Sequence, residues 1–311
     1  MTLKRRTFVH AGAATWAACA AAPFSPGARA ARREILHILC SGPAGSIPDI
    51  VARAIGAQLP ASLAERALVD NRPGAAGQIS VRALKAAPAD GSVLLLAQGA
   101  VATVNPFLYS GLGYDPVLDL QPVSLASEMS LGLAVGPGVP VQVSTLVDFI
   151  AWLRAHPAQA NIGSPGKGTL PHVLAAMLLQ EEGVAWQHIA YAGGPPAITD
   201  MLGGRIGALV LPEGLLRQHQ LAGRVRVLAT SGSARSKYLP EVPSLIELGH
   251  PNLVVKEWFA FFAPLRATRV DIEVASSALR AAIDSAEVAT IFVQSGMTPA
   301  ASTPTALAAR I

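Results

Sequence analysis

The chain reads Glu34-Ile35-Leu36-His37-Ile38-Leu39-Cys40 and continues Ser41-Gly42-Pro43-Ala44-Gly45-Ser46-Ile47-Pro48-Asp49. The first seven residues have the apolar pattern of a strand, and an amphipathic helix pattern follows from about Pro48 to Leu59. The glycine-rich turn between them leaves backbone N–H groups free at the positive end of the helix dipole. This stretch therefore predicts a strand–turn–helix unit whose turn can hold an anion.

A second glycine-rich turn lies much later in the chain and opens a helix through His172 and Met177. It reads Gly163-Ser164-Pro165-Gly166-Lys167-Gly168-Thr169. It is not a phosphate-binding loop, because that motif needs Ser or Thr directly after the lysine, where Gly168 stands, and a first glycine where Asn161 stands. Two anion-binding turns that lie far apart in the sequence suggest that a carboxylate-bearing ligand is held between two lobes.

Strand patterns alternate with helix patterns over most of the chain. Such alternation predicts an α/β protein with mainly parallel sheets covered by helices on both faces. We expect strands at residues 36–40, 67–69, 93–97, 160–163, 187–191, 206–211 and 225–230, and an apolar run at 258–263. We expect helices at residues 48–59, 78–85, 146–155, 169–182, 196–202, 270–285 and 287–295.

No flexible linker separates the two halves of the chain. We therefore expect it to cross twice between lobes, near residues 123–130 and 240–257. One lobe would contain residues 31–125 and 250–311, and the other residues 126–249. Ligands of open α/β sheets lie at the carboxyl ends of the strands, where both glycine turns are expected.

The first thirty residues have the pattern of an export signal that is cleaved near Ala30. A basic start is followed by an alanine-rich apolar stretch and by Ala28-Arg29-Ala30, which resembles a cleavage site. Lys4-Arg5-Arg6-Thr7-Phe8-Val9 resembles a twin-arginine signal, so we expect export to the periplasm. Cys19 lies in a poor lipobox, because Trp16 replaces the usual leucine.

Composition excludes several classes of function. The formal net charge of +4 comes from the basic residues of the leader, and no basic stripe points to nucleic acid. The seven histidines are scattered without metal-ligand spacing, so we expect neither a metal nor a cofactor. After cleavage Cys40 is left alone at the end of an apolar strand, which favours a buried structural thiol.

The turns carry candidate ligand contacts, each with a structural alternative. The first turn offers amides and the Ser46 hydroxyl to a carboxylate, although a plain strand–helix connection also needs glycine. Asp49 can reach a ligand or simply stabilise its helix through the dipole. His172 can donate to a ligand or orient its loop. A third loop, Tyr191-Ala192-Gly193-Gly194-Pro195, can complete a pocket or serve as an ordinary turn.

Several more specific motifs follow one another along the chain. They are Asp70-Asn71-Arg72-Pro73-Gly74-Ala75-Ala76-Gly77, Ala87-Pro88-Ala89-Asp90-Gly91, Asn105-Pro106, Tyr114-Asp115-Pro116, Gly163-Ser164-Pro165-Gly166, Tyr191-Ala192-Gly193 and Asp200-Met201-Leu202-Gly203-Gly204. In order and spacing they resemble the periplasmic solute-binding receptors of the tripartite tricarboxylate transporter system, the Bug family. The resemblance covers residues 34–311.

The resemblance implies a type II-like, two-lobed periplasmic binding protein that closes on a small organic carboxylate without catalysis. Each lobe would hold a mixed, mainly parallel sheet flanked by helices. The protein would be a monomer that works with membrane transporter components or with a sensor protein. The positions that it assigns to the ligand are Pro43, Ala44, Gly45, Ser46, Ser164, Gly166, Gly168, Thr169, His172, Tyr191, Gly193 and Gly194, and Asp49 is kept as a candidate from its place in the first turn of the helix.

The chain departs from the family pattern at a few positions. Ser46 and Ala76 stand where glycine is usual, and Pro48 replaces a small residue. Leu211 falls where many members carry an acid on the strand lining the cleft, so we expect a ligand without an ammonium group. We also expect the chain, which stops at Ile311, to fall short of the final helix that this family normally has.

Two other functions are compatible with the residues. An exported serine hydrolase would use Ser164 and His172, although no G-x-S-x-G elbow surrounds the serine and no third member is identifiable. A binding protein could also act only as a ligand sensor for a partner, without transport.

Overall fold

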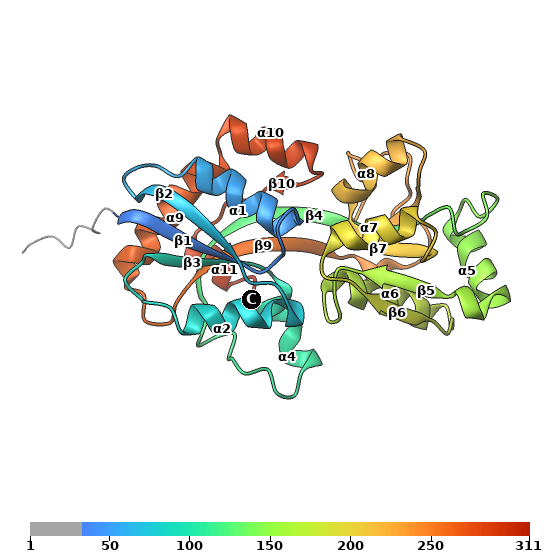
Figure 1. Cartoon of the computed structure of the whole chain (residues 1–311), viewed down its shortest axis with the longest axis horizontal. Helices are drawn as coiled ribbons and strands as arrows, with labels where there is room; N and C mark the ends of the chain where they lie inside the picture. Colours follow the sequence, from blue (N-terminus) through green and yellow to red (C-terminus); the bar gives the residue numbers. More distant parts are fainter. Residues whose placement is uncertain (1–32) are drawn as a thin grey trace, which may run out of the picture.

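The computed structural model describes residues 33–311, drawn in Figure 1. Its strands are β1 (Arg33–Cys40), β2 (Ala64–Asn71), β3 (Val93–Gln98), β4 (Gln121–Val135), β5 (Asn161–Ser164), β6 (Gln187–Ala190), β7 (Ala208–Pro212), β8 (Arg226–Thr230), β9 (Lys256–Ala263) and β10 (Thr298–Pro299). Its α-helices are α1 (Ile47–Ala57), α2 (Gln78–Lys85), α3 (Ala100–Thr103), α4 (Asn105–Leu108), α5 (Leu146–Ala155), α6 (Leu170–Glu181), α7 (Gly194–Leu202), α8 (Glu213–Leu221), α9 (Arg269–Ile283), α10 (Ala286–Gln294) and α11 (Pro304–Ala308).

The strands pair in the order β2-β1-β3-β9-β4-β7-β5-β6, with β8 and β10 also paired to β4. Strand β4 is long enough to serve both halves of the molecule. Its first part, as far as Ser130, pairs with β9, and from Leu131 onward it pairs with β7 and β8. In Figure 1 β4 and β9 run side by side from the half containing β1–β3 toward the half containing β5–β7. We call these the first half and the second half.

In each half the sheet is mixed, with parallel strand pairs on the outside and antiparallel pairs in the middle. The outer pairs β1–β2, β1–β3, β5–β6 and β5–β7 are parallel. The inner pairs that involve β4 and β9 are antiparallel, because the chain leaves the first half along β4 and returns along β9. Helical crossovers therefore place parallel strands at the edges, and the two crossings place antiparallel strands in the middle.

Helices cover both faces of each half. In the first half α1, α9 and α10 pack on one face, with Ile55, Leu279 and Phe292 fully buried, while α2, α3 and α11 cover the other. In the second half α5 and α6 cover one face, and α7 and α8 the other. Such double cover is what the nearly continuous apolar strands require, because each strand must bury side chains on both sides.

Most elements lie where the sequence predicts them. Helices α2 and α5 have the predicted bounds, and the predicted strands at 93–97 and 187–191 lie within a residue of β3 and β6. The prediction left out α8 and treated most of β4 only as a crossing between lobes. Cys40 is fully buried, as expected, and burial raises the pKa of its thiol to about 11.

The predicted export signal, its cleavage site and Cys19 lie outside the described residues. Within residues 33–311 no helix is both long enough and apolar enough to span a bilayer. The predicted lobe boundaries remain a prediction. The structural feature nearest to the first of them is the point after Ser130 where β4 changes its pairing partner from β9 to β7.

Candidate functional site

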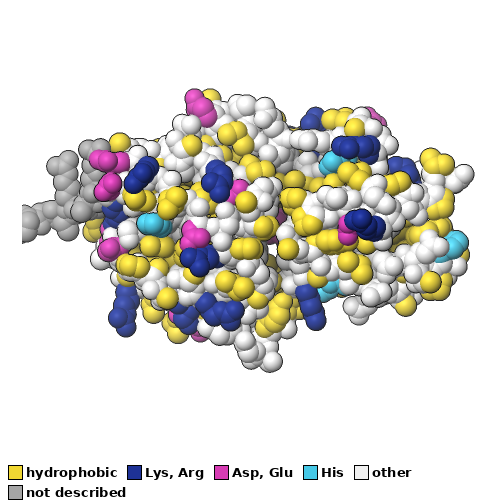
Figure 2. Space-filling view, viewed as in Figure 1, with side chains coloured by type: hydrophobic (Ala, Val, Ile, Leu, Met, Phe, Trp, Pro, Cys, Tyr) yellow, Lys and Arg dark blue, Asp and Glu magenta, His cyan; other side chains and the backbone are white. Residues whose placement is uncertain are grey.

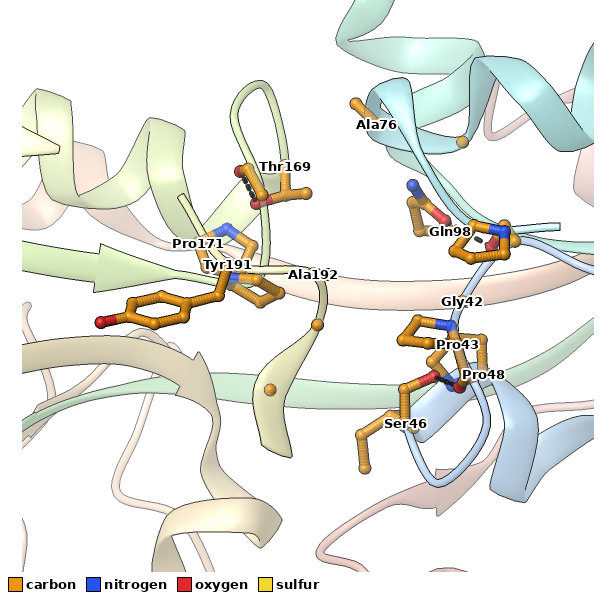
Figure 3. A pocket seen from close by; sticks show the side chains of 18 of the residues that line it. Gly42, Pro43, Ser46, Pro48, Ala76, Gln98, Thr169, Pro171, Tyr191 and Ala192 are labelled. Atoms are coloured by element: carbon orange, nitrogen blue, oxygen red, sulfur yellow. Dashed lines mark hydrogen bonds between the residues drawn. The ribbon is translucent and has the colours of Figure 1, made fainter. Parts of the chain in front are cut away.

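A cavity of about 610 Å³ lies between the two halves. Figure 2 shows the surface hollowed there, with basic and acidic side chains scattered over the rest of this face. Figure 3 shows Pro43, Ser46, Pro48 and Gln98 on one side of the cavity and Thr169, Pro171 and Ala192 on the other. The walls are largely proline, alanine and glycine, so the cavity offers an apolar body with few polar contacts, as small-molecule sites usually do.

The first glycine turn, between β1 and α1, is held in shape by its own hydrogen bonds. The Ser46 hydroxyl donates to the carbonyl of Pro43 at 2.6 Å, and the Ser46 amide donates to the same oxygen at 3.1 Å. Gly45 has a φ of +77°, which a side chain would disfavour. Pro43 and Ser46 line the cavity, whereas Ala44 and Gly45 are exposed outside it.

Asp49 lies behind this turn and not in the cavity. Its side chain is buried and accepts hydrogen bonds from the amide of Gly45 at 2.9 Å, from Asn71 Nδ2 at 2.9 Å and from Arg53 Nε at 3.0 Å. Asn71 also donates to the carbonyl of Gly42 at 2.8 Å. Burial alone would raise the pKa of Asp49, but the bonds from Arg53, Gly45 and Asn71 outweigh it and lower the pKa. The carboxylate therefore fixes the turn from its far side.

Three helix N-termini meet at the cavity. Ile47 begins α1, Thr169 precedes α6, and Gly194 begins α7, and all three residues line the cavity wall. Each helix carries a proline in its first turn, which starts a helix without needing an amide partner. The amides and the helix dipoles at these ends make both walls favourable for an anion, with α1 on one side and α6 and α7 on the other. Lys167, which also lines the cavity, adds a positive charge.

The second turn is built around a buried serine. Ser164 Oγ lies 2.7 Å from His188 Nε2 and 3.1 Å from the carbonyl of Gly166, and Ser164 is fully buried outside the cavity wall. His172 accepts the amide of Gly168 through Nδ1 at 3.2 Å, and its ring lies tilted by 35° against His188, with 4.0 Å between ring centroids. Burial, then the neighbouring His172 and Lys167, lower the pKa of His188 to about 4.

These contacts give Ser164 and His172 a structural role. The serine bonds to His188 and not to His172, so the pair required by a hydrolase does not form. Both side chains shape the turn that carries Gly166 and Thr169 to the cavity. Burial and then Lys167 also lower the pKa of His172, which favours the neutral ring whose Nδ1 accepts the loop amide.

The predicted contacts divide into those that line the cavity and those that support it. Lining the cavity are Pro43, Ser46, Gly166, Thr169, Tyr191, Gly193 and Gly194. Outside the lining are Ala44, Gly45, Asp49, Ser164, Gly168 and His172. The ring of Tyr191 points away from the opposite wall in Figure 3, and its hydroxyl donates to Asp200 Oδ2 at 3.0 Å.

The two walls touch at both ends of the cavity. The Tyr109 hydroxyl donates to the carbonyl of Lys167 at 3.2 Å, and a Cβ built on Gly168 would lie 2.1 Å from that hydroxyl. On the other side a Cβ on Gly193 would lie 2.8 Å from Pro43 Cγ. Gly168 and Gly193 also have positive φ values, +80° and +101°. Glycine at these positions lets the halves approach each other over the cavity.

Several cavity residues lie outside the motifs that the sequence makes recognisable as ligand contacts. Gln98, at the end of β3, accepts a hydrogen bond from the Ser41 hydroxyl at 2.6 Å, and both residues line the cavity. Ala75 and Ala76 form a short helical turn with φ values of +48° and +52°, unusual for alanine. The Asn-Arg-Pro-Gly turn that precedes them could have pointed to this segment, because it ends the strand next to β1.

Glu257 changes the expectation drawn from Leu211. Leu211 is fully buried among the apolar side chains under α7 and α8 and does not line the cavity. An acid nevertheless lines it: Glu257, at the start of β9, on the returning strand. The absence of an acid at position 211 therefore does not leave the cavity without a carboxyl group. In the part of the chain that the structure describes, no group of His, Cys, Asp and Glu side chains is arranged to hold a metal.

The architecture and the cavity together define a class: an α/β periplasmic binding protein with its ligand cavity between two halves. The fold matches that of the periplasmic binding protein BugD, with a TM-score of 0.82 at 24% identity, over 89% of this chain and 92% of BugD. A Rhodopseudomonas palustris protein solved with adipate matches with the same TM-score and identity, over 88% of this chain and 91% of that one.

Sequence comparison gives the family. Residues 51–309 match the tripartite tricarboxylate transporter family receptor, and the chain belongs to this family. BugT of Bordetella pertussis is 32% identical over 285 residues, which cover 91% of this chain and 86% of BugT. The family is one of binding proteins and not of enzymes, so the hydrolase interpretation of Ser164 and His172 is wrong.

Proposed function

We propose that this protein captures a small organic carboxylate in the cavity between its halves and delivers it to a tripartite tricarboxylate-type transporter. The observation that carries the proposal is the meeting of three helix N-termini, those of α1, α6 and α7, at one largely apolar cavity. Such a wall holds an anion with backbone amides and dipoles, while proline and alanine side chains contact the hydrocarbon part.

The adipate-bound relative of the same fold supports a carboxylate as the ligand. The volume of about 610 Å³ is ample for a small acid. No side chain is needed for covalent chemistry, since binding alone is the function. The predicted contacts that line the cavity, from Pro43 and Ser46 on one side to Thr169 and Gly194 on the other, are proposed as ligand contacts.

Binding is proposed to close the two halves. Residues 31–125 with 250–311 would move as one lobe and residues 126–249 as the other, around the crossings in β4 and before β9. A ligand that contacts both walls binds the closed form more tightly and shifts the population toward it. The contacts of Tyr109 with Lys167 and of Pro43 with Gly193 would then form the rims of the closed cavity.

We further propose that the chain is exported by the signal in residues 1–30 and acts in the periplasm as a monomer. The closed form would present a surface to the membrane components of the transporter, or to a sensor protein. The twin-arginine-like start of the signal supports export after folding.

Isothermal titration calorimetry of the purified protein tests the proposal. The panel contains mono-, di- and tricarboxylates, including adipate, together with amino acids and aromatic acids. We expect micromolar or tighter binding to one class of carboxylate, with no product formed. Heat from none of the carboxylates would contradict the proposal.

A further inference from the structure

We propose that Glu257 is a specificity-determining residue that meets the ligand as a neutral carboxylic acid and donates a hydrogen bond to a second acceptor oxygen on it. This inference rests on the proposed function and names the polar group at the far end of the ligand. The ligand would carry one carboxylate for the helix N-termini and a further carboxylate, hydroxyl or keto oxygen for Glu257.

Strand geometry brings Glu257 to the cavity. Alternate residues of a strand share a face, and both Glu257 and Phe259 of β9 line the cavity. The residues between and beside them point the other way: Lys256 lines a second cavity of about 380 Å³, and Trp258 packs close to Gly99. Figure 3 shows β9 passing behind the cavity from one half to the other. Glu257 thus lies where the two walls meet.

The carboxyl group of Glu257 has no cationic partner among the described residues, and its charged form gains only a hydrogen bond from the Trp258 backbone. The residue is 4% exposed, and its Oε1 is buried without a hydrogen-bond partner in the described part of the chain. No Lys, Arg or His within residues 33–311 forms an ion pair with it. A buried, unpaired carboxylate is costly, and such a group takes up a proton instead. Burial raises the pKa of Glu257 to about 8, against a small opposing effect of the Trp258 backbone.

The charged groups around Glu257 do not alter this picture. The other titratable residues of the cavity wall are Lys167, Tyr109 and Tyr191. Strand β3, which pairs with β9, carries no titratable residue. On β4, Glu128 lines the second cavity and is paired with Arg310. Among residues 33–311, Glu257 is therefore the one acid in the lining of the main cavity, and Lys167 is the one cation.

A neutral acid in this place discriminates between ligands. Its O–H donates to an acceptor oxygen, and a charge-assisted bond to a carboxylate is stronger than a neutral one. An ammonium group cannot accept this O–H; it can only donate to the carbonyl oxygen of the neutral acid, without the attraction that a carboxylate charge would supply. The geometry therefore favours dicarboxylates and hydroxy or keto acids over amino acids, for a physical reason that lies in Glu257 and not in Leu211.

The test measures adipate binding as a function of pH. Above about pH 8 the free protein loses the proton that the bond requires, so adipate affinity should fall about tenfold per pH unit. E257Q should bind adipate more weakly, because an amide replaces the acid, and should show no such pH dependence. E257M, which keeps the length of the side chain without a donor, should weaken binding about tenfold or more.

Two further measurements separate this role from a merely structural one. E213Q is the matched control: Glu213 is also a buried carboxyl with an unpartnered oxygen, but it lines the second cavity. This variant should keep the wild-type pH dependence of adipate binding. Infrared spectroscopy of ligand-free E213Q, which lacks the other buried carboxyl with a raised pKa, should show at pH 7 a protonated-carboxyl band that titrates near pH 8 and is lost when E257Q is added.

The outcomes are distinct. If the wild-type protein bound none of the carboxylates in the panel, the proposed function and this inference would both be overturned. Carboxylate binding that is equal in the wild type, E257Q and E257M, with one pH profile, would overturn this inference alone. So would the absence of the protonated-carboxyl band, or glutamate binding that tightens with rising pH and is lost in E257Q.

Discussion

Asp49 holds the first glycine turn from behind, through three hydrogen bonds that converge on one buried carboxylate. We predict that Asp49→Ala lowers the free energy of unfolding by about 1–3 kcal/mol, because the amides of Gly45 and Asn71 lose a charged acceptor. Ligand affinity should fall as well, since the turn carries Pro43 and Ser46. Denaturant unfolding and calorimetry measure the two effects.

Arg53→Gln is the control for this prediction. The Arg53 side chain also bonds to Asp49 but is 54% exposed, so its loss should cost less than about 1 kcal/mol. An Arg53→Gln effect as large as that of Asp49→Ala would show that the ion pair, and not the anchoring of the turn, is what matters.

Single residues show how far the sequence predicts the site. A turn between a strand and a helix faces the carboxyl edge of the sheet, so Pro43, Ser46 and Thr169 could be placed near a ligand from sequence. Which way a residue points within the turn depends on φ values that sequence does not give, and Ala44 therefore lies outside the cavity. The sequence did not point to Glu257. Alternation along a strand shows which residues share a face of the sheet, but it does not show which face borders a cavity formed by two distant segments.

At the scale of elements, the turn before α6 and the segment after α4 meet across the cavity. We predict that Gly168→Ala weakens ligand binding, because its Cβ would overlap the Tyr109 hydroxyl and keep the halves apart. Its positive φ adds a strain of about 1 kcal/mol that is independent of Tyr109. The affinity for a bound carboxylate, measured by calorimetry, is the readout.

The double variant Gly168→Ala/Tyr109→Ala isolates the clash. Removing the ring should recover part of the affinity lost in Gly168→Ala, although Tyr109→Ala alone loses the bond to the Lys167 carbonyl. The two effects should therefore be non-additive, as expected for residues in contact. Strict additivity would contradict a closing contact between these elements.

Elements with local periodicity were predictable, and the crossing strand was not. Helix α5 begins after Thr145, whose hydroxyl and Asp148 form a reciprocal cap, and such signals are readable from sequence. Strand β4 contains Pro122 and is interrupted by two register shifts, so its pattern does not alternate cleanly. Its length makes sense only when both halves of the sheet are present.

At the scale of the whole molecule, the described residues 33–311 place two buried carboxyl groups where the halves meet, Glu257 at the main cavity and Glu213 at the second. Glu213 lies at the start of α8, next to Gly214, which packs against the backbone of Ser295 and Gly296 in the other half. Both groups are therefore desolvated by the packing of one half on the other. The junction between the halves should consequently be the part of the molecule whose stability responds most to pH.

Burial raises the pKa of Glu213 to about 7 and that of Glu257 to about 8, whereas both titrate near 4.5 when unfolded. Between pH 4.5 and 8 these two carboxyls therefore bind more protons in the folded protein than in the unfolded chain, whereas His188, with a folded pKa of about 4, has the opposite effect below its unfolded value of 6.5. The slope is at most about 1.4 kcal/mol per pH unit for each group. We predict that the unfolding free energy, from denaturant titrations at constant ionic strength, declines from about pH 6.5 to about pH 8, where the histidines are neutral in both states and no longer offset the two carboxyls. In the Glu213→Gln/Glu257→Gln variant this decline should largely vanish, because neither amide titrates. An equal decline in the variant would mean that other groups, and not these two carboxyls at the junction, set the pH dependence.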